Sequence, residues 1–192
     1  ARPEQWGEAN RNVDFFDLKA DLEALLLPRV AEFERAAHPA LHPGRSARVL
    51  LDGREIGFIG ELHPVWVQRY ELGTAPVVFE VELDALRDTV TPAYREVSRF
   101  PAVTRDLALV VDQGMAAASL LKALWSAAPP IVQHIELFDQ YQGKGIEQNR
   151  KSLAFRVVMQ ETQRTLEDAE VDAAMVLLTR HAEENLGAKL RG

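Results

Sequence analysis

The order in which strand and helix periodicities follow one another in the second half of the chain constrains the fold more than any other feature. Residues 105–112, 131–141 and 151–160 are apolar or alternating runs of strand length, and residues 188–191 form a short fourth one. Two helical patterns, residues 115–127 and 165–186, separate the first strand from the second and the third from the fourth. The predicted order is therefore β-α-β-β-α-β.

Local signals support these boundaries. Pro129 and Pro130 stop the first helix, and Gly187 is a natural residue at the end of the second. Thr165, with Asp168 three residues later, predicts a capping box at the start of that helix. The order is that of the split βαβ, ferredoxin-like fold, so we expect an α+β domain with both helices on one face of the sheet and the other face open.

The first half of the sequence is less regular. Residues 13–17 predict a strand that enters a helix over residues 18–35, and residues 47–60 predict a hairpin around Asp52 and Gly53. A short helix over residues 64–70 and a strand over residues 77–83 complete an antiparallel α+β pattern. These elements are few for an independent domain and the chain opens on Ala1, so we interpret the sequence as a piece of a longer protein.

Composition excludes several classes of protein. With 47% hydrophobic and 27% charged residues among 192, the chain is neither disordered nor fibrous. It holds no cysteine, which excludes disulfides and thiolate metal sites. No stretch approaches the roughly 18 to 20 apolar residues of a membrane helix, and no signal-like segment is present, so we expect a cytoplasmic protein without a membrane partner.

The net charge of −7 is unevenly distributed. Residues 1–98 carry net −6 and residues 99–192 only −1, and residues 144–164 hold five basic side chains against two acidic ones. A local field, not the total charge, decides whether a phosphate backbone can dock. The acidic total therefore does not exclude a nucleic-acid partner.

Candidates for catalysis and metal binding are weak. His38, His42, His63 and Glu61 offer metal-ligand chemistry, but each histidine precedes a proline in a turn-like segment, so the turn interpretation is favoured. No serine or cysteine nucleophile motif is present, and the glycines around Lys144 lack the P-loop spacing. We expect no catalytic residue, metal site or cofactor in this chain.

The segment 138–143 carries the most informative chemistry. A strand-end Tyr141 can stack on an unpaired base, Asp139 can accept a hydrogen bond from an exocyclic amine, and neighbouring cations can meet phosphates. The candidate phosphate contacts are Arg105, Lys144, Arg150 and Lys151. Alternatively, Tyr141 caps a core edge, the lysines are solvated and Arg105 forms a local ion pair. Simple alternation sets Asp139 and Tyr141 on the face of Leu137, so a bulge is needed to bring them beside Ser152.

Four motifs of the second half closely resemble the ferredoxin-fold anticodon-binding domain of bacterial phenylalanyl-tRNA synthetase beta subunits. They are RFPAVTRDL at 99–107, LFDQYQG at 137–143, KSLA at 151–154 and RTLEDAEV at 164–171. The first half resembles part of the catalytic-like, non-catalytic module of that subunit, which is related to class II synthetase cores. The motifs there are VDFFDLK at 13–19, HPALHPGRSA at 38–47 and GFIGELHP at 57–64.

The resemblance implies a domain plan and a function. Residues 1–90 are the end of the catalytic-like module, 91–98 a linker and 99–192 the anticodon-binding domain. The intact enzyme is an (αβ)2 heterotetramer that attaches phenylalanine to tRNA(Phe) with ATP and Mg²⁺, and its alpha subunit holds the active site. The family's anticodon contacts fall on Ala108, Asp139, Tyr141 and Ser152: Tyr141 stacks, Asp139 and Ser152 hydrogen-bond base edges, and Ala108 permits close approach.

Other functions of the same layout stay open at this point. A small-molecule regulatory domain binds its ligand at the first strand–helix turn, here residues 112–114, and Gly114 permits that. An acylphosphatase needs a basic residue in the same turn, and residues 112–118 hold none. An RNA-recognition motif expects stacking aromatics on both central strands, whereas residues 105–112 hold none and residues 151–160 only Phe155.

Overall fold

The structure, a computed structural model, describes residues 11–87, 94 and 96–191. The chain divides into two compact units, residues 1–93 and 94–192, which we describe separately. The expected linker over residues 91–98 lies partly outside the described residues, because 91–93 and 95 are not among them.

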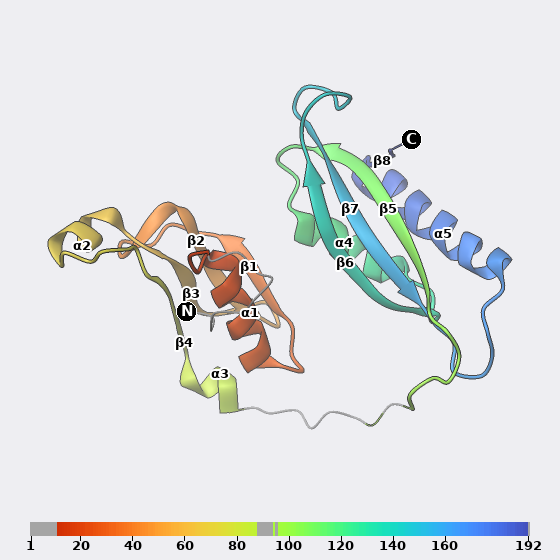
Figure 1. The fold of residues 1–192 in the computed structure, drawn as a ribbon, viewed down its shortest axis with the longest axis horizontal. Helices are drawn as coiled ribbons and strands as arrows, with labels where there is room; N and C mark the ends of the chain where they lie inside the picture. Colours follow the sequence, from red (N-terminus) through yellow and green to blue (C-terminus); the bar gives the residue numbers. More distant parts are fainter. Residues whose placement is uncertain (1–10, 88–93, 95, 192) are drawn as a thin grey trace. The chain divides into compact units, whose positions relative to one another are not determined.

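Unit 1 is a four-stranded antiparallel meander with one long helix packed on it (Figure 1). Its strands follow the order β1-β2-β3-β4 in the sheet, and α1 packs against β3 and β4. Buried Leu22 and Leu26 of α1 meet Val49 and Ile59 in the core. The elements are α1 (Phe15–Leu26), β1 (Ala31–Arg35), β2 (Leu41–Leu51), β3 (Arg54–Leu62), α2 (Pro64–Arg69), β4 (Val77–Val81) and α3 (Leu83–Arg87).

The predicted strand over 13–17 is wrong, and the predicted helix over 18–35 is present but begins at Phe15 and ends at Leu26. Asp14 caps α1: its carboxylate accepts from the backbone N–H of Phe16 and of Asp17, at 2.8 and 3.1 Å, and the Asp17 carboxylate accepts the Asp14 N–H at 2.9 Å. Two aspartates in capping positions outweigh the strand-like Val-Asp-Phe-Phe pattern. Pro28 has no N–H to continue the helix, so α1 ends at Leu26 and the chain returns as β1.

The predicted hairpin of unit 1 is confirmed. Leu51 pairs with Arg54, and the two residues between them, Asp52 and Gly53, have φ of +53° and +78°. Two positive φ angles match the right-handed twist of the flanking strands, and Asp-Gly adopts them readily.

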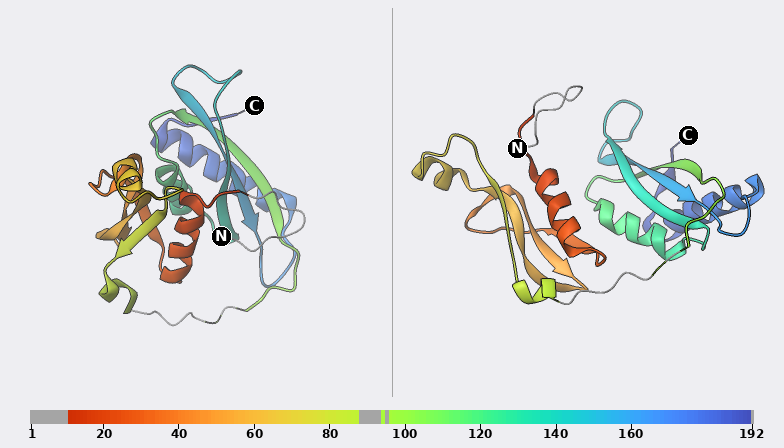
Figure 2. Two further views of the ribbon diagram at one scale, coloured as in Figure 1. Left: turned by 60° about the vertical axis from the view of Figure 1, so that its left-hand side comes forward. Right: turned by 60° about the horizontal axis from the view of Figure 1, so that its bottom comes forward.

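Unit 2 confirms the predicted β-α-β-β-α-β order. Its antiparallel sheet has the order β6-β7-β5-β8, and α4 and α5 both lie on one side of it (Figures 1 and 2). Among the described residues of unit 2 itself, no helix covers the other side, which we call the open face. The elements are β5 (Val103–Asp112), α4 (Ala117–Ala127), β6 (Val132–Tyr141), β7 (Arg150–Met159), α5 (Asp168–Leu186) and β8 (Lys189–Leu190).

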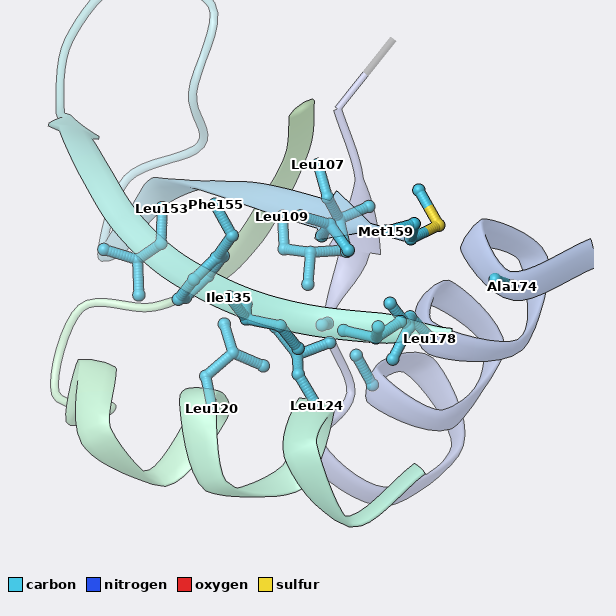
Figure 3. Close-up of a cluster of buried hydrophobic side chains, with 14 of the residues drawn as sticks. Leu107, Leu109, Leu120, Leu124, Ile135, Leu153, Phe155, Met159, Ala174 and Leu178 are labelled. Carbon is cyan, nitrogen blue, oxygen red and sulfur yellow. The ribbon is translucent and has the colours of Figure 1, made fainter. Parts of the chain in front are cut away.

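The core of unit 2 fills the space between the sheet and the two helices (Figure 3). Every second residue of β5 and β7 points into it, and Phe155 at the centre of β7 is fully buried. Leu120 and Leu124 from α4, and Val171, Ala174 and Leu178 from α5, recur at helical spacing and close the core from the other side. Burial of each large side chain contributes about 1.5–3 kcal/mol, so alternation fixes which residues are left for the open face.

The start of α5 differs from prediction. The helix begins at Asp168, and Glu170, not Asp168, occupies the capping position: its carboxylate accepts the Glu167 N–H at 3.0 Å. The Arg164 guanidinium donates to both oxygens of the same carboxylate. The Arg164 hydrogen bonds and the Glu167 N–H together lower the pKa of Glu170 to about 2.

We therefore expect Glu170→Gln to lower the Tm of the chain at pH 7, and this deficit to depend on pH. Because the folded-state pKa lies below the unfolded value of about 4.5, the carboxylate stabilises the fold fully above that pH and loses its effect as pH falls toward 2. Thermal unfolding of both proteins from pH 7 to pH 2 measures the gap. Glu183→Gln, in the last turn of the same helix, is the control and leaves Tm unlowered. A gap of constant size down to pH 2 contradicts the prediction.

Candidate functional site

A β-bulge in β6 decides which side chains reach the open face. Leu137 pairs with Phe155 of β7, but the next pair is Asp139 with Ala154, so Phe138 is an extra residue without a partner of its own. The bulge reverses the alternation of β6 at this point. Asp139 and Tyr141 thereby share a face with Ala154 and Ser152, as the site hypothesis requires.

The pairing aligns the predicted base-contacting residues in two adjacent rows across the open face. Tyr141 lies opposite Ser152 in β7, and Ser152 lies opposite Val110 in β5. In the neighbouring row, Asp139 faces Ala154, and Ala154 faces Ala108. The structure therefore brings together all four residues, from three strands: Ala108, Asp139, Tyr141 and Ser152.

The four residues differ in accessibility. Asp139 is exposed, Tyr141 and Ala108 are half-buried, and Ser152 is only 2% exposed. Small side chains at Ala108 and Ala154 leave the middle of the face shallow. The Asp139 carboxylate is thus available to a ligand directly, whereas Ser152 presents little surface.

Two contacts fix the Tyr141 ring. Its hydroxyl donates to the Lys144 carbonyl at 3.2 Å, and the Arg191 guanidinium lies over the ring, 5.0 Å from its centroid. Arg191 reaches this position because β8 pairs with β5 and the Arg191 N–H donates to the Ala108 carbonyl at 2.9 Å. Sequence reasoning missed Arg191, since β8 has only two residues and is too short for a periodicity that would place its flanking side chains.

The predicted phosphate contacts do not gather in one place. Arg105 alternates with Leu107 and so lies on the helix-covered side of β5, where it is 4.0 Å from Asp168 of α5. Arg150 is half-buried between Asp112 and Glu147, at 3.5 and 3.7 Å. Its Nη1 is buried and makes no hydrogen bond within the described residues.

Lys144 and Lys151 stand at the end of the β6–β7 hairpin with their charges uncompensated. Lys144 is exposed, whereas Lys151 is half-buried and, opposite Val111, lies on the helix-covered side of β7. Neither forms an ion pair with any described residue. The positive charge counted over residues 144–164 is partly compensated by carboxylates from other parts of the chain. Asp106 pairs with Arg156, and Glu170 pairs with Arg164, both from outside that segment.

Arg156 and Phe138 form a second aromatic–arginine pair on the open face. The Arg156 Nε and Nη2 donate to the two Asp106 oxygens at 3.0 and 3.1 Å, and these hydrogen bonds lower the pKa of Asp106. The guanidinium lies 4.7 Å from the centroid of the Phe138 ring. Strict alternation along β6 would place Phe138 and Tyr141 on opposite faces of the sheet. Because of the bulge, both lie on the open face.

The histidines of unit 1 support the turn interpretation. The Nδ1 atoms of His38, His42 and His63 accept the backbone N–H two residues later, at 3.3, 3.0 and 3.2 Å. His63 thereby caps α2, while His38 and His42 stabilise the backbone around the start of β2. Across residues 11–87, 94 and 96–191, no group of three or more potential ligands could hold a metal ion. Nor is any described helix long and apolar enough to cross a membrane.

Comparison with known proteins assigns both units. Residues 98–191 match the family model described as the ferredoxin-fold anticodon binding domain, and residues 1–83 match the phenylalanyl tRNA synthetase beta chain CLM domain. The whole chain is 65% identical to the phenylalanine–tRNA ligase beta subunit of Aromatoleum aromaticum and 59% identical to that of Dechloromonas aromatica. In both cases it spans 24% of the relative's length.

Fold and family model together define unit 2 as an anticodon-binding domain of the ferredoxin fold. The two matches follow one another along the same chain as parts of one kind of subunit. The chain belongs to the phenylalanine–tRNA ligase beta subunit family, of which it represents about a quarter of the length. The alternative of a small-molecule regulatory domain at residues 112–114 does not fit these matches.

The contact between Gly143 and Tyr141 generates a prediction about the site itself. A Cβ added at Gly143 would lie 2.9 Å from the Tyr141 hydroxyl oxygen, so we expect Gly143→Ala to displace the ring. Gly145→Ala is the matched control, because Gly145 also has a positive φ but nothing lies within 4 Å of its added Cβ.

Nuclear magnetic resonance measures the displacement. Arg191 side-chain protons near the ring carry a ring-current shift in the wild type, which Gly143→Ala reduces and Gly145→Ala leaves in place. Tyr141→Phe identifies the ring signals. Equal changes in the two alanine variants would show that loop strain, not contact with the ring, is responsible.

Proposed function

We propose that the open face of unit 2 binds the anticodon region of tRNA(Phe) within an intact phenylalanine–tRNA ligase. The observation that supports this most is the bulge at Phe138, because it brings Asp139 and Tyr141 onto one face with Ala108 and Ser152. A sheet face with an aromatic ring, a carboxylate and small neighbouring side chains has the chemistry for reading unpaired bases.

Each residue has a distinct role in this proposal. Tyr141 stacks on one base, and the Asp139 carboxylate accepts a hydrogen bond from an exocyclic amine. Ala108 permits close approach of the base to the sheet, and Ser152 hydrogen-bonds a base edge. Lys144 meets the phosphates. Lys151 and Arg105 contribute less because they lie on the helix-covered side, and Arg150 because Asp112 and Glu147 lie beside it.

The remaining parts of the proposal concern the intact enzyme. Residues 1–90 form part of the catalytic-like module, a non-catalytic relative of class II synthetase cores that supports the alpha subunit. Residues 91–98 are the linker, and residues 99–192 the anticodon-binding domain. The enzyme is a cytoplasmic (αβ)2 heterotetramer, and the aminoacylation chemistry, with ATP and Mg²⁺, belongs to the alpha subunit.

Tyr141→Ala tests the stacking role. In the intact enzyme, we expect it to weaken the Kd for tRNA(Phe) by about 5- to 150-fold, the equivalent of one base–aromatic stack of about 1–3 kcal/mol. Direct binding at one fixed salt concentration measures the effect. The loss disappears when the tRNA carries an abasic site at the stacked position.

Trp125→Ala is the control for this measurement. Trp125 is 41% exposed on α4, on the helix-covered side of the same sheet, and its removal leaves the affinity unchanged. Equal affinities of Tyr141→Ala and wild-type enzyme for tRNA(Phe) would contradict the stacking role.

Salt dependence separates the lysines from the base contacts. Lys144→Gln removes one phosphate contact, so we expect it to weaken binding of all sequences alike and to reduce the slope of log K against log salt by about 0.7. Tyr141→Ala leaves that slope unchanged. An unaltered slope in Lys144→Gln would remove Lys144 from the interface.

A further inference from the structure

We propose that Phe138 is a second base-stacking position on the open face, which takes another unpaired nucleobase of the RNA loop that Tyr141 contacts. This inference rests on the proposed function, since it needs the open face to bind RNA. It assigns a ligand to the bulged residue itself, which the four predicted contacts leave unused.

Phe138 is built as a surface aromatic and not as part of the core. The side chain is 45% exposed, while its neighbours Ile135 and Leu137 pack toward the helices. As the extra residue of the bulge, it has no partner in β7, and the Arg156 guanidinium lies 4.7 Å from its centroid, on the open face. An exposed phenyl ring with one cationic neighbour is a surface on which a base can stack.

Arg156 is suited to hold the ring and not to bind phosphate. Asp106 takes two of its hydrogen bonds, and Glu136 lies directly opposite it in β6. Both carboxylates oppose the positive charge, and the two hydrogen bonds to Asp106 fix the plane of the guanidinium. Arg156 therefore acts as a positioning residue that orients the Phe138 ring.

The surface between the two rings fits a nucleic acid strand. Phe138 and Tyr141 lie three residues apart on β6, a separation of about 10 Å at roughly 3.3 Å per residue. Beside them, the row of Ala154 and Ala108 presents only methyl groups, and Asp139 supplies the polar edge. Tyr141 carries Arg191 and Phe138 carries Arg156, so the two positions repeat one arrangement.

The test compares Phe138→Leu with Phe138→Trp in the intact synthetase. Leucine keeps the apolar volume and loses the π face, so we expect about 5-fold or greater weakening of the Kd for tRNA(Phe). Tryptophan keeps the π face and stays within about 2-fold of wild type. Arg156→Lys keeps the charge but not the planar group, and weakens binding by an intermediate factor.

A second readout locates the contact. With 2-aminopurine placed at each unpaired loop position in turn, we expect Phe138→Leu to relieve fluorescence quenching at one position and Tyr141→Leu at a different one. This measurement, together with Arg156→Lys, keeps the proposal testable if Phe138→Leu lowers the Tm substantially.

Each outcome has one meaning. If Tyr141→Leu weakens binding and Phe138→Leu does not, the second stacking position is overturned while the proposed function stands. If neither Tyr141→Leu nor Phe138→Leu changes the affinity for tRNA(Phe), the proposed function fails and this inference fails with it. If Phe138→Leu changes subunit assembly in sedimentation but not the RNA affinity of the assembled enzyme, Phe138 contacts protein, and the inference is overturned.

Discussion

The register shift in the β6–β7 pairing is the constraint on which the candidate site depends. The core fixes Leu153 and Phe155 of β7 toward the helices, so Ser152 and Ala154 are left for the open face. Without an extra residue, β6 would send Asp139 and Tyr141 into the helix-covered side, where a carboxylate is costly to bury. With the bulge, Leu137 before Phe138 packs into the core, and Asp139 after it lies on the open face.

The fold of unit 2 could be predicted from the sequence because burial dictates its periodicities. Alternating residues in 151–160 and the stripe at Leu120 and Leu124 are direct consequences of one buried face. The site was only partly predictable. Alternation exposed the parity conflict and required a bulge, but it could not locate the extra residue, which depends on pairing between strands.

Failures in unit 1 and at α5 have a common physical origin. In both places a pair of acidic residues forms the capping box that sets the start of the helix: Asp14 with Asp17 in α1, and Glu167 with Glu170 in α5. Sequence spacing alone identifies these pairs poorly, because Asp17 and Glu170 are each also stabilised by an arginine. Arg11 contacts Asp17, and Arg164 contacts Glu170, and neither pair is visible as a local helix motif.

Charge patterning misleads for a related reason. Sequence counts compare neighbours along the chain, whereas Asp106 and Asp112 reach the arginines of β7 from β5 across the sheet. The cations that matter for an anionic ligand are those that the sheet leaves uncompensated, at the hairpin end.

Arg156 and Arg191 instead stack on aromatic rings. Under the proposed function, a base that displaces Arg191 from Tyr141 also removes a π contact of about 0.5–1 kcal/mol, so the net gain from stacking lies toward the lower end of about 1–3 kcal/mol. Under the proposed function, base specificity at this face comes mainly from the exposed Asp139 carboxylate, whose hydrogen bonds distinguish one base edge from another.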